Sequence, residues 1–565
     1  RRISPQMGRS RQLAITGALH SVLLLALVIG TRPACADSVE LIDAGRQIYE
    51  EGILPDGSNL VATRPEGLIL PGQFAACVRC HRASGMGSVE GVVDKAILVP
   101  PVAGPVLFAP ALFADSFLDE EHHYVPHPTW RRAMKRPAYD RESLGTAMRQ
   151  GINTMGEPLE APMLHYDLDE RSLSALTAYL EVLGAKTDPG VGVDTITVGT
   201  VVAPDADPDD ARVLLEVIRA FTRHTKAAGK PLRLTQWRLA GDADTWPAQL
   251  QDAYREQPVF ALLSGIGKSE WQPVHEFCEN NGIACILPSL DVIPAADGHF
   301  SIYFSPGVEL EAAVFARFLA DEPPGGRVFQ LFSNASGRKA AEKLSATLNT
   351  AGVETEVRKF RVTAPSLSLQ GIADADVTML WLGADELEQL AYLEEKGLPG
   401  STYFSATLAE PSSVNLPPSW RERVRIVTLD DDISVQTEVA RLRLSRWLDQ
   451  HGIAEHNNRR VQADAYVAVY LFNAALSRIR RQEIRRPEVP LTREHVLETI
   501  EALVSKSADG TTLLDQDLQI AHYGRMSLGP TQRISTRGGS VMKFAPGSSS
   551  RFVPVSERIT PRWRP

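Results

Sequence analysis

The sequence predicts a multidomain protein: an all-α domain of residues 38–186 followed by a larger, two-lobed α/β half of residues 195–547. Length is the first indication, because 565 residues are too many for one hydrophobic core. The second is a pair of helical patterns that frame the first domain. The third is the alternation of β-branched runs with amphipathic helices from residue 195 onward, which is typical of parallel α/β sheets.

The first 36 residues have the pattern of an export signal. Four arginines precede an apolar run from Leu13 to Gly30, and Ala34-Cys35-Ala36 is a cleavage site of the A-x-A type. We therefore expect cleavage after Ala36 and a periplasmic mature chain. Two alternatives stay open. In the first, the signal is not cleaved and its apolar run, which approaches spanning length, is retained as a membrane anchor. In the second, the residues before Cys35 serve as a lipobox and Cys35 carries a lipid.

Net charge limits the classes of binding partner, and the cysteine count limits the possible disulfides. A formal net charge of −10 argues against nucleic acid, and against an anionic membrane surface, as the main partner. It is compatible with docking to a basic patch on a redox partner. If Cys35 leaves with the signal, Cys278 and Cys285 remain beside one other pair of cysteines. They form either a disulfide or two buried thiols, because spacing does not determine their geometry.

That other pair belongs to Cys77-Val78-Arg79-Cys80-His81, a CxxCH motif. Two thiols at this spacing add to the vinyl groups of a porphyrin, and the adjacent histidine ligates the iron. A zinc site would need a second ligand pair, and a thioredoxin-like site would need a strand before Cys77. We therefore expect one covalent haem c, attached at Cys77 and Cys80 with His81 as an iron ligand.

Two helices frame this motif. Residues 43–52 and 169–184 have helical periodicity, and Gly45 would let the helices cross closely with Tyr179 filling the notch. The arrangement resembles class I cytochromes c. The resemblance implies an all-α domain over residues 38–186.

The resemblance also implies a methionine as the sixth iron ligand. The loop of residues 151–166 places Met163 where the family has its ligand, although Leu164 replaces the usual proline. Met155 is the alternative. A thioether ligand raises the reduction potential and fills the last iron position, as in an electron carrier. Three further histidines are expected in a surface loop: His122, His123 and His127.

Residues 187–194 form a turn-rich linker, and the α/β pattern follows it. Strands are expected at Thr195–Val202, Leu232–Trp237, Val259–Ser264, Ala284–Leu287, Val328–Ser333, Glu354–Phe360, Val377–Leu382, Thr402–Phe404 and Arg425–Leu429. Helices are expected at Asp209–Ala227, Trp246–Arg255, Trp271–Asn280, Glu309–Leu319, Gly337–Thr350 and Glu386–Lys396. This number of strands favours two sheets. Residues 548–565 are expected to be a flexible tail.

Four segments of this half resemble type I periplasmic binding proteins, the leucine/isoleucine/valine-receptor class: residues 259–273, 281–289, 303–306 and 461–469. The resemblance implies one lobe of about residues 195–305 with part of 430–547, and a second of about 306–429. It also implies a ligand between the lobes at the carboxyl ends of strands.

Carried over by position, the family's ligand contacts fall on Ser264, Gly265, Ser269, Ser289 and Tyr303, with weaker matches at Ser333, Asn334 and Asp385. The loop of residues 203–208 lacks the family's glycines, and residues 335–337 lack its tyrosine. We therefore predict an unknown small-molecule ligand and do not assume an amino acid.

Together these features predict a periplasmic electron-transfer protein that accepts electrons from a dehydrogenase, for example a quinoprotein, or from another cytochrome. The alternative is a solute-binding receptor of an ABC-type transport or sensing system whose haem reports redox state. A haem enzyme would need an open iron site. Because no nucleophile–base pair appears elsewhere, we expect a carrier and binding protein that is not a self-contained catalyst.

Overall fold

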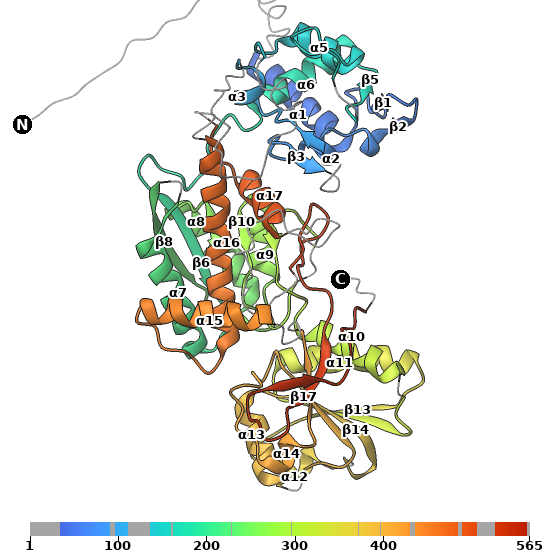
Figure 1. The fold of residues 1–565 in the computed structure, drawn as a ribbon, viewed down its shortest axis with the longest axis vertical. Coiled ribbons are helices and arrows are strands. Elements are labelled where there is room, and N and C mark those ends of the chain that lie inside the picture. The colour runs from blue at the N-terminus through green and yellow to red at the C-terminus, as the bar shows by residue number, and fades with distance from the viewer. Residues whose placement is uncertain are drawn as a thin grey trace, which may run out of the picture. The chain divides into compact units, whose positions relative to one another are not determined.

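A computed structural model describes residues 34–90, 97–110, 136–159, 162–227, 229–294, 297–321, 323–370, 372–395, 397–429, 435–483, 489–504 and 526–561 (Figure 1). Most of the expected signal segment, and also His122, His123 and His127, lie outside these residues. The chain divides into a first unit, Arg1–Cys77 with Asp140–Leu180, and a second unit, Val78–Tyr139 with Glu181–Pro565. Across the described ranges, no helix has the length and apolar character needed to cross a membrane.

The first unit combines helices with a small antiparallel sheet. Its helices are α1 (Ala34–Glu51), η1 (Gly72–Phe74), α5 (Arg141–Gln150) and α6 (Glu170–Val182), and its strands are β1 (Val61–Thr63), β2 (Ile69–Pro71) and β5 (His165–Tyr166). The strand order is β2-β1-β5. The expectation of an all-α domain is therefore corrected. The chain reverses between β1 and β2 because Gly67 adopts a φ of 89°, which brings its amide within 2.8 Å of the Arg64 carbonyl oxygen.

The predicted close crossing of the two framing helices is confirmed. A Cβ atom on Gly45 of α1 would lie 2.0 Å from the carbonyl oxygen of Ala175 in α6, so only glycine fits there. The rings of Tyr49 and Tyr179 pack with centroids 5.4 Å apart. The Tyr179 hydroxyl also donates to Glu50 Oε1 at 3.2 Å. These contacts hold α1 against α6.

The second unit begins with the segment that follows Cys77. Its elements are α2 (Val78–His81), β3 (Ser88–Glu90), β4 (Ile97–Val99) and α3 (Gly104–Leu107). Strands β3 and β4 pair antiparallel. The remainder of the unit consists of two α/β lobes.

The first lobe has a six-stranded sheet of order β11-β10-β9-β6-β8-β7. Its strands are β6 (Ile196–Val202), β7 (Lys226–Ala227), β8 (Lys230–Arg238), β9 (Ala261–Leu263), β10 (Ala284–Ile286) and β11 (Ser301–Ile302). Its helices are α7 (Pro208–His224), η3 (Ala243–Thr245), α8 (Trp246–Glu256), α9 (Gln272–Asn280), α15 (Val435–Gln450), α16 (Arg459–Glu483) and α17 (Arg493–Val504).

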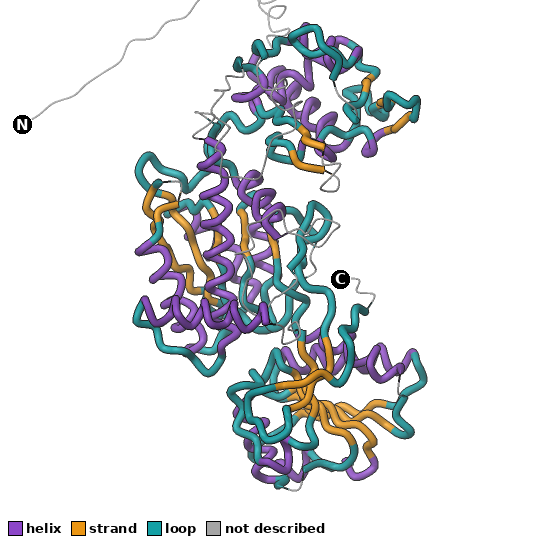
Figure 2. The backbone as a smooth tube through the Cα atoms, viewed as in Figure 1, coloured by secondary structure: helices purple, strands orange, loops and turns teal. Residues whose placement is uncertain are grey.

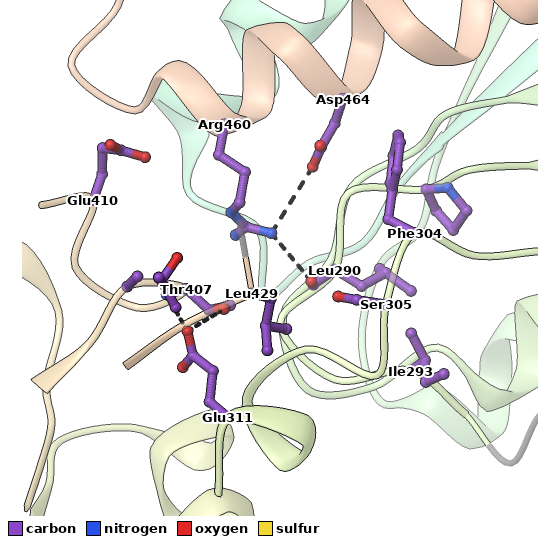
Figure 3. A pocket seen from close by; sticks show the side chains of 13 residues that line it. Leu290, Ile293, Phe304, Ser305, Glu311, Thr407, Glu410, Leu429, Arg460 and Asp464 are labelled. Carbon is purple, nitrogen blue, oxygen red and sulfur yellow. Dashed lines mark hydrogen bonds and ion pairs between the residues drawn. The ribbon is translucent and has the colours of Figure 1, made fainter. Parts of the chain in front are cut away.

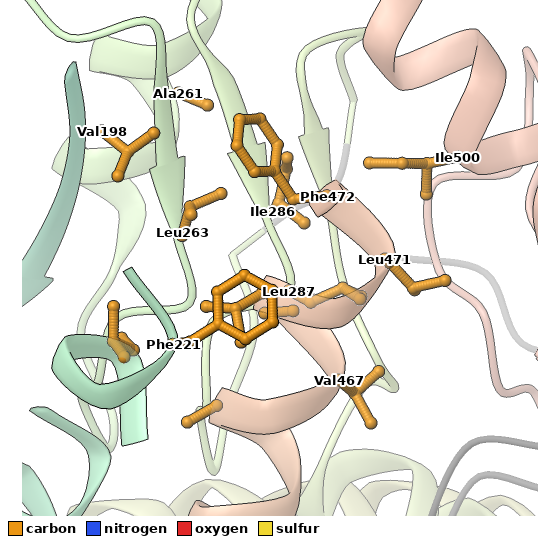
Figure 4. Close-up of a cluster of buried hydrophobic side chains, with 14 of the residues drawn as sticks. Val198, Phe221, Ala261, Leu263, Ile286, Leu287, Val467, Leu471, Phe472 and Ile500 are labelled. Carbon is orange, nitrogen blue, oxygen red and sulfur yellow. The ribbon is translucent and has the colours of Figure 1, made fainter. Parts of the chain in front are cut away.

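Both faces of this sheet are buried. Figure 4 shows one face, where Leu263 and Ile286 pack against Phe221 of α7 and Phe472 of α16. Leu262 points to the opposite cluster, beneath α8 and α9. Alternation along a strand covered on both faces explains the continuous apolar runs in the sequence. The disulfide alternative is the one found: Cys278 of α9 bonds to Cys285 of β10.

The second lobe has a seven-stranded sheet of order β13-β12-β14-β15-β16-β17-β18, and Figure 2 shows its strands with helices around them. Its strands are β12 (Arg327–Phe332), β13 (Thr355–Lys359), β14 (Ala375–Trp381), β15 (Ser401–Ser405), β16 (Arg425–Thr428), β17 (Ser540–Phe544) and β18 (Phe552–Pro554). Its helices are α10 (Val308–Asp321), α11 (Ala335–Thr350), α12 (Pro365–Ser368), η4 (Ile372–Asp374), α13 (Ala384–Leu393) and α14 (Pro418–Arg421).

The predicted strands and helices of the α/β half are confirmed, with ends within three residues of those expected. The end of the chain differs from the expectation of a flexible tail. Strand β18 pairs antiparallel with β17, and Phe552 packs on Phe544 with ring centroids 5.2 Å apart. This strand extends the sheet of the second lobe because its aromatic residue finds an apolar partner.

Candidate functional site: a cavity between the two lobes

A cavity of about 30 Å³ lies where the two lobes of the second unit meet (Figure 3). It is lined by Pro288, Leu290, Ile293, Phe304, Ser305, Glu311, Ala406, Thr407, Glu410, Thr428, Leu429, Arg460 and Asp464. Pro288, Ala406 and Thr428 stand at the carboxyl ends of β10, β15 and β16. The carboxyl edge of parallel strands is where α/β folds place ligands.

Glu311, in the first turn of α10, is a fully buried carboxyl in the wall of this cavity. One oxygen accepts from the Thr407 amide at 3.0 Å and the Thr407 hydroxyl at 2.9 Å. The other accepts from the Ser405 hydroxyl. Burial raises the pKa of Glu311 to about 7, against the opposing effect of these hydrogen bonds. A carboxyl in this range changes charge near neutral pH.

Arg460, in the first turn of α16, spans the other side of the cavity (Figure 3). Its guanidinium donates to Asp291 Oδ1 at 2.8 Å and to the Leu290 carbonyl oxygen at 3.2 Å. Asp464 Oδ2 lies 3.9 Å away and accepts from the Ser289 hydroxyl at 2.7 Å. The arginine therefore ties α16 to the loop after β10.

A model of the family described as "Periplasmic binding protein" matches residues 210–527. The chain belongs to this family. The fold is also that of a fatty acid ABC transporter substrate-binding protein from Thermomonospora curvata, with a TM-score of 0.50 and 14% identity over 67% of this chain and 95% of that chain. A leucine-binding protein from Thermotoga maritima gives a TM-score of 0.47 and 13% identity over 65% and 99%.

A valine-bound branched-chain amino acid ABC transporter protein from Thermus thermophilus gives a TM-score of 0.48 and 14% identity, over 66% of this chain and 98% of that chain. No curated protein matches the sequence significantly. Membership confirms the predicted two-lobed periplasmic binding protein fold and places the chain among extracytoplasmic binding proteins.

The five predicted ligand contacts of this binding protein lie outside the cavity lining. Ser289 comes nearest, since its hydroxyl donates to the lining residue Asp464. Tyr303 is buried, with its hydroxyl 2.9 Å from His275 Nδ1, and the next residue, Phe304, lines the cavity. As ligand contacts, these residues stay predictions.

The other three of the five lie after β9. Ser264 and Gly265 form a sharp turn with φ of 53° and 113°. The Ser264 hydroxyl is buried without a hydrogen-bond partner in the described part of the chain. Ser269 donates its amide to Asp205 Oδ2 at 2.9 Å. These residues shape and brace the loop that follows β9.

The weaker predictions in the second lobe are explained by local structure. Asn334 caps α11 by accepting from the Gly337 amide at 2.9 Å. Ser333 directly follows β12, and Asp385 lies exposed in the first turn of α13. The sequence analysis missed Glu311 and Arg460, because each is an ordinary residue of a helix first turn. Thr407 could have been predicted from the sequence, because it lies just past the end of a predicted strand, where α/β folds place ligands.

The histidine of the CxxCH motif in this binding protein is held in place through one ring nitrogen. His81 is buried at the end of α2, and its Nδ1 lies 2.9 Å from the Pro100 carbonyl oxygen. Because a carbonyl only accepts, Nδ1 carries the proton and Nε2 keeps its lone pair. Burial lowers the pKa of His81 and favours the neutral imidazole. These features fit an iron ligand.

The structure also describes the other residues predicted to bind the haem. Cys77 is buried in the first unit, and Cys80 is exposed in α2 of the second unit. Met163 is half-buried, whereas its rival Met155 is 47% exposed. In the described ranges no group of three His, Cys, Asp or Glu side chains could hold a metal ion.

Proposed function

We propose that this protein is an extracytoplasmic solute-binding protein of an ABC-type transport or sensing system. The observation that carries the proposal is the cavity between the lobes, where charged and hydroxyl groups from both lobes line one space. The structural neighbour from Thermomonospora curvata is an ABC transporter substrate-binding protein, which supports the same role. This gives the receptor function priority over electron transfer.

Both lobes contribute to the site, which is what solute capture requires. Glu311 and Thr407 come from the second lobe, whereas Arg460 and Asp464 come from the first. A ligand held by groups of both lobes stabilises their contact. Such a ligand binds the folded protein only, so it raises the melting temperature.

A thermal-shift screen of the full chain tests the receptor function. The panel contains amino acids, carboxylates, alcohols, aromatics and amines. We expect one class to raise the melting temperature, and Arg460→Ala to abolish that shift because Asp291 and Leu290 lose their partner. Arg255→Ala, at an exposed position of α8, should retain it. If no class shifts the melting temperature, or if both variants respond like the parent, the cavity is not the binding site.

We also propose that the chain carries one haem c, attached through Cys77 and Cys80. The hydrogen bond from His81 Nδ1 to the Pro100 carbonyl supports this, because it orients the imidazole as a metal ligand. Bound haem would supply one-electron chemistry, and His81 and Met163 would hold its iron. Electron exchange with a periplasmic dehydrogenase or another cytochrome is then a second function.

Haem staining after denaturing electrophoresis tests the attachment, because only covalent haem survives it. We expect a stained band that Cys80→Ser weakens and a Cys77→Ser/Cys80→Ser double variant removes. Cys278→Ser provides the control, since that cysteine lies in the disulfide. An unstained parent protein from a strain that matures c-type cytochromes would contradict the haem proposal. That result would leave solute binding unaffected.

A further inference from the structure

We propose that the ligand of the interlobe cavity is a small organic cation, namely an alkylamine without a carboxylate. This inference rests on the proposed solute-binding function and names its ligand class. Four features carry it: the sign of the lining charges, the use of the arginine, the hydrogen bonds of Glu311 and the size of the cavity.

The charged side chains that line the cavity are mostly acidic. Three carboxyls, Glu311, Glu410 and Asp464, face one cation, Arg460. A fourth carboxyl, Asp291, lies buried behind the arginine and is paired with it. A cleft lined by an excess of one charge attracts ligands of the opposite charge. The excess here is negative.

Arg460, the cation in the cavity lining, already donates its hydrogen bonds to protein groups and does not offer them to a ligand carboxylate. The Arg460 guanidinium donates to Asp291 and to the Leu290 carbonyl oxygen. A ligand carboxylate would have to compete with Asp291, which would then remain as a buried charge without its partner. Separating a buried ion pair is strongly unfavourable. Arg460 therefore holds the cavity wall, and an anionic ligand finds no ready binding group.

Glu311 is arranged to accept from a ligand. The backbone and hydroxyl donors around it, on Thr407 and Ser405, already point at its two oxygens. A carboxylate offers about four acceptor positions. Three are occupied by these donors, so one is left for an N–H group in the cavity. An ammonium group supplies that donor together with the matching charge.

The apolar part of the lining limits the rest of the ligand. Leu290, Ile293, Phe304 and Leu429 line the same space as the charged groups. A volume of about 30 Å³ is small, since a single water molecule needs about 10–15 Å³ measured in the same way. These walls suit a short alkyl chain attached to the ammonium group.

Three probes with the same short alkyl chain separate the charge types: ethylamine, alanine and propanoate. Calorimetric titration of the full chain at pH 8 measures their affinities. We expect ethylamine to bind at least tenfold more tightly than alanine and propanoate. Tighter binding of alanine or of the acid overturns the inference and leaves solute binding intact. Binding of none of the three also overturns it, and the wider screen then decides the receptor function separately.

A matched pair of variants locates the binding group. Glu311→Gln keeps the shape of the side chain but removes its charge, and we expect at least a tenfold loss of amine affinity. Glu309→Gln, two residues earlier in α10 and outside the cavity lining, should stay within twofold of the parent. Equal affinities for both variants contradict the role of Glu311. Far-ultraviolet circular dichroism of each variant verifies that it is folded.

Discussion

Arg82, the residue after His81, forms an ion pair with Glu501 of α17, 419 positions along the chain. Glu501 is buried and also pairs with Arg533. Nearby, the Ser84 amide donates to Glu498 Oε1 at 2.9 Å. These contacts with the buried Glu501 and Glu498 therefore anchor the segment that follows the CxxCH motif to α17, in the first lobe of the binding fold.

Removal of the shared carboxylate should destabilise this anchor. In a Glu501→Gln variant, Arg82 and Arg533 lose the negative charge between them, and breaking a buried pair costs about 3–5 kcal/mol. We expect a clear fall in the melting temperature in scanning calorimetry. The exposed Glu422 provides the control, since Glu422→Gln should shift it by less than about 1 °C. A Glu501→Gln melting temperature equal to the parent's would show that the pair contributes nothing.

Glu311 should make stability depend on pH. Its folded pKa of about 7 lies above the ordinary value of 4.5, so the stabilisation is fully present below pH 4.5 and is lost as pH rises through about 7. The groups around it are the Ser405 and Thr407 hydroxyls, with Arg460, Glu410 and Asp464 across the cavity. A shift of this size corresponds to about 3 kcal/mol.

Comparison with Glu311→Gln isolates this contribution, because glutamine does not titrate. Relative to the variant, the parent should lose stability between pH 4.5 and pH 8, as followed by urea denaturation. The stability difference between the two proteins should change by about 3 kcal/mol over that range. A difference that is independent of pH would mean that Glu311 titrates at its ordinary pKa.

The crossing of α1 and α6 should tolerate only glycine at position 45. In Gly45→Ala the new methyl group would lie 2.0 Å from the Ala175 carbonyl oxygen and 2.7 Å from Tyr179 Cβ, so the helices must separate. Overpacking of this kind costs about 1–3 kcal/mol. Gly529→Ala is the control, since an added Cβ there meets nothing within 4 Å. Proteolysis within residues 38–77 should accelerate only in the first variant, and equal rates would contradict the tight crossing.

The two candidate methionines should differ in their effect on the proposed haem. Met163→Ala should abolish the methionine–iron charge-transfer band and lower the reduction potential, because a thioether favours Fe(II). Met155→Ala, at the exposed position, should change neither. Visible spectra and a redox titration measure both effects. Loss of the band in Met155→Ala alone would assign the ligand to Met155.

The sequence by itself determined most strands and helices between residues 195 and 429, because alternation of apolar residues is a local property of the chain. It also predicted the close contact at Gly45, since a glycine followed four residues later by Tyr49 marks one helix face. In contrast, β18 was missed because Phe552 finds its apolar partner, Phe544, only on the neighbouring strand.

Only the tertiary structure decided the site. Glu311 and Thr407 are 96 positions apart, and Arg460 and Asp291 are 169 positions apart. Their types and local patterns carry no sign of these pairings. Whether a charge is paired, buried or available to a ligand depends on which distant groups the fold brings within a few ångströms, because electrostatic and hydrogen-bond energies act at that range. The cavity and the anchor of Arg82 therefore follow from how the strands and helices pack, which no local pattern specifies.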